Sequence, residues 1–112
     1  MRFENSTTKG LLISKVLDAR VDAAVAHDLK AALLTHFQPE PQTVVLNLEA
    51  VGFVDSSGLG ALVSVLKNRG NGGDLVICGA TGAVASMFKL TRMDKVFRVF
   101  GTVDDAVQAL GK

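Results

Sequence analysis

Two short runs of the sequence, Thr43–Leu48 and Leu75–Cys78, are apolar at nearly every position. A strand with one face in water alternates apolar and polar residues, whereas a nearly continuous apolar run suits a strand that is covered on both faces. Such strands occur in parallel sheets with helices on both sides. The two runs therefore predict the centre of a layered α/β domain.

Strand-like and helix-like segments alternate around these runs. Leu11–Leu17 and Val96–Phe100 are short, apolar and partly β-branched, so both predict further strands. Phe3 and its neighbours predict an additional edge strand, joined to the next one through the turn-prone residues Thr8-Lys9-Gly10. Apolar residues at helical spacing predict four helices. They are expected from Asp22 to a stop at Pro39 and Pro41, over Ser57–Lys67, around Val84–Phe88, and from Thr102 through Leu110.

The order of these elements predicts a single α/β domain that spans residues 1–112. Its central sheet is expected to be mixed but largely parallel, with four to five strands flanked by about four helices. A chain of 112 residues that is 48% hydrophobic can form one core without disulfides or metal.

Charge and hydropathy exclude several classes of function. Lys and Arg number 12 and Asp and Glu 11, and this near balance argues against a nucleic-acid-binding domain, which depends on a basic face. No apolar run approaches the roughly 18 residues of a membrane span. Arg2 and Glu4 lie where a signal peptide would need an apolar stretch. We therefore expect a soluble, cytoplasmic protein that binds no nucleic acid and has no membrane span.

Few side chains of the sequence commonly bind metals or act as nucleophiles. Cys78 is the only cysteine, which excludes an internal disulfide, and its place in an apolar run predicts a buried strand residue. His27 and His36 are expected to be exposed on a helix, nine positions apart, which is not the spacing of a metal-binding pair. We expect neither a metal site nor a cofactor.

The most informative segment is Asp55-Ser56-Ser57-Gly58-Leu59-Gly60. It lies between a buried strand that ends near Leu48 and an apolar helix that begins near Ser56. Asp55, Ser56 and Ser57 are all residue types that cap helices well. Gly58 and Gly60 each weaken a helix by about 1 kcal/mol relative to alanine, so we expect another backbone or surface to approach closely here.

A hydroxyl group at the start of a helix has a distinctive electrostatic setting. The free backbone N–H groups and the positive end of the helix dipole favour an added anion. Phosphorylation of Ser56 would add about −1.5 to −2 charges at neutral pH. The helix would tolerate this charge, whereas a partner docked over the same spot would not. The segment therefore suits a switch that changes binding and preserves the fold.

Asp55–Gly60, preceded by Val45–Leu48, resembles the signature of STAS domains, and of bacterial anti-sigma factor antagonists in particular. The resemblance spans essentially the whole chain. It implies a protein that is not an enzyme, with Ser56 as the phosphoacceptor and Ser57 as a neighbour that shapes the helix start. It also implies that Asp22, which follows an apolar residue before the first helix, contributes to the partner surface.

The resemblance further implies specific partners. In this family the unmodified antagonist captures an ATP-binding serine kinase that is also an anti-sigma factor, and thereby frees the sigma factor. Phosphorylation releases the antagonist, and a separate serine phosphatase resets it. The residues expected to contact the partner are Asp22, Asp55, Ser57, Gly58 and Leu59. Ala19-Arg20 departs from the family pattern, because an acidic residue commonly stands where this chain has Arg20, and this puts the identity of the kinase in doubt.

Other interpretations stay open. Ser56 and Asp22 could each be plain helix caps. The domain could also be a regulatory subunit of a lipid or anion transport system, since that is a second role within the STAS family. A small nucleotide-dependent enzyme is a third hypothesis, which rests only on the α/β order. A hydrolase elbow is not favoured, because Val54 stands where the first glycine of that motif is required.

Overall fold

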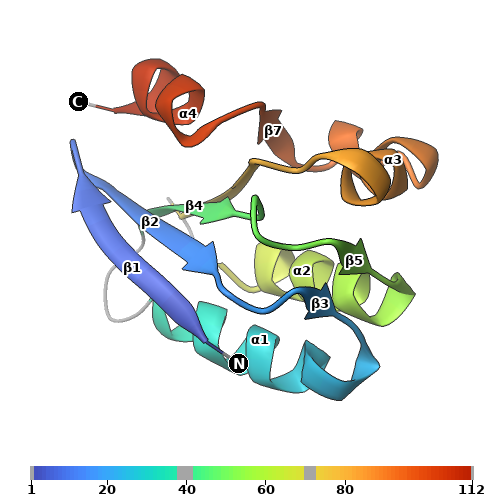
Figure 1. The fold of residues 1–112 in the computed structure, drawn as a ribbon. Coiled ribbons are helices and arrows are strands. Elements are labelled where there is room, and N and C mark those ends of the chain that lie inside the picture. Colours follow the sequence, from blue (N-terminus) through green and yellow to red (C-terminus); the bar gives the residue numbers. More distant parts are fainter. Residues whose placement is uncertain (1, 38–41, 70–72, 112) are drawn as a thin grey trace.

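The computed structural model describes residues 2–37, 42–69 and 73–111 (Figure 1). Its centre is a five-stranded sheet in the order β1-β2-β4-β6-β7. β1 is antiparallel to β2, and all other pairs are parallel. The strands are β1 (Phe3–Thr8), β2 (Leu11–Val16), β4 (Thr43–Asn47), β6 (Asp74–Cys78) and β7 (Arg98–Phe100). The prediction of a mixed, largely parallel sheet is confirmed, including the edge strand at Phe3.

Four α-helices of the described chain flank this sheet, as predicted. They are α1 (Ala23–Thr35), α2 (Ser56–Lys67), α3 (Gly82–Leu90) and α4 (Val103–Leu110), with a short 3₁₀ helix, η1 (Met93–Lys95), after α3. The predicted stop of the first helix at Pro39 and Pro41 lies outside the described residues, and α1 itself ends at Thr35.

The hairpin between β1 and β2 turns at Lys9-Gly10. Both residues have positive φ angles, 49° and 80°, as a two-residue type I′ turn requires. Glycine adopts this conformation without steric cost. The turn predicted at Thr8-Lys9-Gly10 is therefore present, and the positive φ angles of Lys9 and Gly10 form it.

The two faces of the sheet are covered unequally. The larger core cluster combines one face of the sheet with residues such as Leu29 of α1, Leu62 of α2 and Phe88 of α3. On the other face, α4 packs through Ala106 against Ile13, Val45 and Cys78. Figure 1 shows α1 and α2 on the side of the sheet opposite α4. Both central strands are therefore buried on two faces, as their apolar runs predict.

The structure contains a second sheet that the sequence patterns did not predict. Two-residue strands β3 (Arg20–Val21) and β5 (Phe53–Val54) pair in parallel, with Arg20 opposite Phe53 and Val21 opposite Val54. Each strand leads directly into a helix, so this small sheet fixes where α1 and α2 begin.

The expectation of an exposed His36 is wrong, whereas His27 is exposed as predicted. His36 follows the last turn of α1, beside the buried Phe37, and it is half-buried. Within the described part of the chain its Nε2 atom is buried without a hydrogen-bond partner. Burial lowers the pKa of His36, because the charged imidazolium loses its hydration.

Candidate functional site

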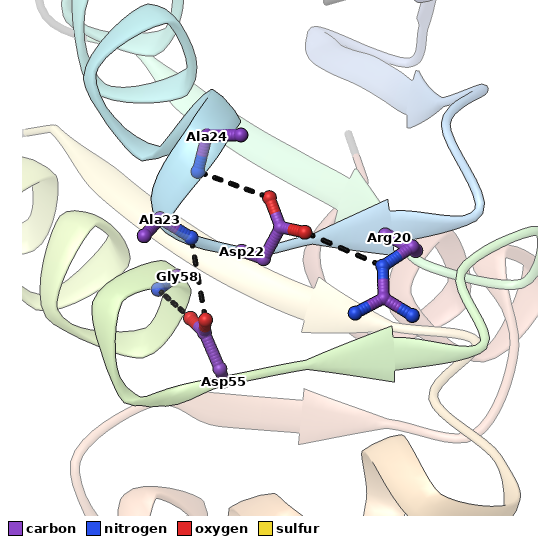
Figure 2. A network of polar contacts seen from close by, with 6 residues as sticks. All are labelled: Arg20, Asp22, Ala23, Ala24, Asp55 and Gly58. Carbon is purple, nitrogen blue, oxygen red and sulfur yellow. Dashed lines mark hydrogen bonds and ion pairs between the residues drawn. The ribbon is translucent and has the colours of Figure 1, made fainter.

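The candidate site lies where two helices begin side by side. β3 and β5 run parallel and in register, and each is followed at once by an aspartate, Asp22 before α1 and Asp55 before α2. Because equivalent ends of parallel strands meet at one edge, the two helix N-termini are neighbours (Figure 2). Their free N–H groups and dipoles together make this surface favourable for negative charge.

Asp55 connects the two helix starts. Its Oδ1 atom accepts a hydrogen bond from the N–H of Gly58 (2.9 Å), so Asp55 is the N-cap of α2. Its Oδ2 atom accepts from the N–H of Ala23 (3.3 Å) in the first turn of α1. Its own N–H donates to the carbonyl oxygen of Val21 (3.2 Å). One carboxylate therefore sets the position of α2 relative to α1.

Asp22 is the N-cap of α1. Its Oδ1 atom accepts from the N–H of Ala24 (3.1 Å), and its Oδ2 atom accepts from Nε of Arg20 (3.3 Å). The Arg20 guanidinium also lies 4.3 Å from the ring centroid of Phe53, on the paired strand. Arg20 is thus held between an aromatic ring and a carboxylate, while 63% of its side chain is exposed.

Ser56 and Ser57 are the first two residues of α2, and both are exposed. Because Asp55 supplies the cap, the interpretation of Ser56 as a plain helix cap is wrong. Among the described residues neither serine hydroxyl forms a hydrogen bond to another group of the chain. Ser56 is therefore an exposed residue at the positive end of a helix.

Gly58 and Leu59 face inward from the same turn. A Cβ atom on Gly58 would contact the carbonyl oxygen of Val21 and lie 2.9 Å from its Cγ1 atom. The expected close approach is confirmed here, and the approaching backbone is β3 of the same chain. Leu59 is only 5% exposed and belongs to the main core. The expected apolar contact between Leu59 and a partner therefore does not fit this position, because the side chain is already packed in the core.

Gly60 does not follow the same explanation. Nothing lies within 4 Å of a Cβ atom built at this position, and the residue is exposed. The close approach that explains Gly58 is absent at Gly60, and nothing else in the described structure explains this glycine.

Sequence reasoning missed the contribution of Phe53. This ring is 37% exposed and supports Arg20 beside the helix starts. A signal is present in the sequence, because Arg20-Val21-Asp22 and Phe53-Val54-Asp55 share the pattern x-Val-Asp before a helix. This repeated tripeptide marks the two paired strands and places both first residues on the same surface.

The described residues contain no group of three or more His, Cys, Asp or Glu side chains that could hold a metal ion. No helix among them is long and apolar enough to cross a membrane. The thiol of Cys78 is buried as predicted, and burial, helped by the charge of Glu49, raises its pKa to about 11.

Several known proteins resemble this chain. The anti-sigma-B factor antagonist of Staphylococcus aureus (strain NCTC 8325 / PS 47) is 26% identical over 95 residues, which cover 84% of this chain and 88% of that protein. The crystal structure of an anti-sigma factor antagonist from Mycobacterium paratuberculosis matches with a TM-score of 0.86 and 26% identity, over 97% of this chain and 92% of that one.

The same fold occurs in a sulfate transporter family protein from Wolinella succinogenes, with a TM-score of 0.77 and 19% identity, over 93% of this chain and 87% of that one. That likeness shows the fold alone. The model of the STAS domain matches residues 5–106. The match includes both helix starts and the whole parallel part of the sheet, and the chain therefore belongs to the STAS domain family.

Proposed function

We propose that this STAS domain is an anti-sigma factor antagonist, a non-enzymatic cytoplasmic regulator that binds an anti-sigma factor with serine kinase activity and is released by phosphorylation of Ser56. The observation that carries the proposal is the exposed Ser56 at the first turn of α2, where Asp55 already provides the cap. The anti-sigma factor antagonists that resemble the chain over most of its length support it.

The switch follows from the charge of the phosphate group. At the start of α2 a phosphate is stabilised by free N–H groups and the helix dipole, so it does not unfold the domain. A partner packed against the same helix start would meet about two negative charges and lose its contact. The added charge therefore acts on binding and leaves the fold intact. A serine phosphatase would restore the binding form.

We assign the partner surface to the exposed groups around the paired helix starts. Ser57 lies beside Ser56, and Asp22 holds Arg20 at the edge of the same surface. Asp55 and Gly58 support this surface by fixing the separation of α1 and α2. Arg20 lies exposed at one edge of this surface, where its charge is paired with that of Asp22.

Incubation with ATP and each kinase-type anti-sigma factor encoded in the same genome tests the proposal. We expect phosphate to be transferred to the wild-type protein and to Ser57→Ala, but not to Ser56→Ala. Ser57→Ala is the matched control, because it removes the adjacent hydroxyl from the same helix turn.

Phosphate on Ser56→Ala at the wild-type level would refute the site. If no kinase of this type bound or modified the protein and it co-purified with a transport protein instead, the role in a transport system would replace the proposal.

A further inference from the structure

The outer edge of the five-stranded sheet is formed by β7. Among the described residues no strand pairs with this edge, and Val99 in the middle of β7 is 40% exposed. Figure 1 shows β7 and α3 on the side of the molecule away from α1. Unpaired N–H and C=O groups at a sheet edge can pair with an extended segment of another chain.

An apolar groove of about 370 Å³ lies beside this edge, between α3 and β7. Its lining includes Ala85 and Phe88 from α3, Val99 from β7, and the charged residues Lys89 and Asp94. A groove next to an open edge can receive side chains from a strand that pairs with that edge. The backbone and the groove thus offer two kinds of contact to the same segment.

The surface around the groove is basic. Lys89, Arg92, Lys95 and Arg98 are all exposed, and with Asp94 they give residues 89–98 a net charge of +3 in a chain whose total is +1. In the part of the chain that the structure describes, none of the four forms an ion pair. Four cations without an ion-pair partner favour an acidic ligand. They also disfavour pairing of two copies of this edge, which would bring two basic segments together.

We propose that the open edge of β7 binds an acidic, extended segment of a partner protein as an additional strand. The residues involved lie outside the paired helix starts, so this proposal does not depend on the role of Ser56. The surface would let the domain hold a partner while the switch at Ser56 acts elsewhere.

Side chains alternate between the two faces of the sheet along β7, and this alternation predicts the sequence of a segment that pairs with it. Val99 pairs with Ile77, which points into the main core, so Val99 faces the α3 side of the sheet. Arg98 and Phe100 point to the opposite face, because side chains alternate along a strand. An added strand would place apolar residues over the groove and acidic residues beside Arg98. The recognised segment therefore alternates apolar and acidic residues.

An NMR titration of the ¹⁵N-labelled protein tests the proposal, with a capped peptide of alternating glutamate and valine, about eight residues long, as the probe. We expect saturable amide shifts at residues 96–101 and along the groove, weakened by salt. Arg98→Glu should lower the affinity by about tenfold, since it turns attraction into repulsion. Lys30→Glu on α1 is the matched control, because it changes the net charge equally and should leave the affinity within about twofold.

The proposal is overturned if the peptide causes no shifts, if the shifts scatter over the whole chain, or if a lysine–valine peptide binds equally well. Binding of the same residues to phosphatidylglycerol vesicles, with no response to the acidic peptide, would assign the surface to a membrane instead. If Arg98→Glu does not keep the dispersed spectrum of the folded protein, Lys95→Glu in η1, outside the sheet, makes the same test.

Discussion

Gly58 and Gly60 lie in the first turns of α2, but only Gly58 has atoms in the space of a side chain. We expect Gly58→Ala to lower the free energy of unfolding by about 1–3 kcal/mol, because its methyl group would press against Val21. Gly60→Ala should raise it by about 1 kcal/mol, since alanine favours a helix and meets nothing within 4 Å. Urea unfolding measures both changes, and equal effects of the two substitutions would contradict the close contact with β3.

The buried thiol of Cys78 allows a second prediction at the residue scale. Burial raises its pKa from 9.0 to about 11. Near pH 8 the thiolate fraction is therefore about a hundredfold lower than in the unfolded chain. We expect a thiol reagent to react at least that much more slowly with the native protein than with the protein in denaturant. Equal rates would show that the strand opens to solvent.

The same shift makes stability depend on pH. The pKa of Cys78 is higher in the folded state, so its contribution is fully present below pH 9 and is lost as the pH rises from 9 towards 11. Unfolding curves between pH 9 and 11 should show this decrease in the free energy of unfolding. In Cys78→Ala the decrease should be smaller.

At the scale of elements, the aspartates before α1 and α2 differ in what they hold together. Asp55 accepts from Gly58 in α2 and from Ala23 in α1, whereas Asp22 caps only its own helix. We expect Asp55→Ala to cost about 2 kcal/mol and Asp22→Ala about 1 kcal/mol of unfolding free energy. Thermal or urea unfolding measures the difference, and a larger loss for Asp22→Ala would contradict the role of Asp55 in joining the helices.

The elements that sequence patterns predicted well are those with many residues in a regular spacing. The second helix was expected at Ser57 and begins at Ser56. β3 and β5 could not be predicted in this way, because each has two residues and exists only through pairing with a distant segment. The strand expected at Val96 begins at Arg98, because the N–H of Phe97 donates to the carbonyl oxygen of Met93 and continues the turn of η1.

At the scale of the whole molecule, the apolar runs of β4 and β6, together with the alternation of strands and helices, predicted a layered α/β domain with a largely parallel sheet. The position of Ser56 at the start of a helix was also predictable from the residue types of its segment. The juxtaposition of Asp22 with Asp55 was not, because it depends on the small sheet that brings two helix starts together. Local patterns thus located the serine, and tertiary structure alone assembled the surface around it.

The central claim is that negative charge on Ser56 changes binding and preserves the fold. The most direct measurement is the affinity of the purified protein for its kinase-type anti-sigma factor, before and after stoichiometric phosphorylation of Ser56, together with its free energy of unfolding in both forms. We predict a fall in affinity of at least about tenfold, with stability unchanged or raised by up to about 1 kcal/mol. Equal affinity of the two forms, or a loss of affinity that accompanies unfolding, would contradict the account.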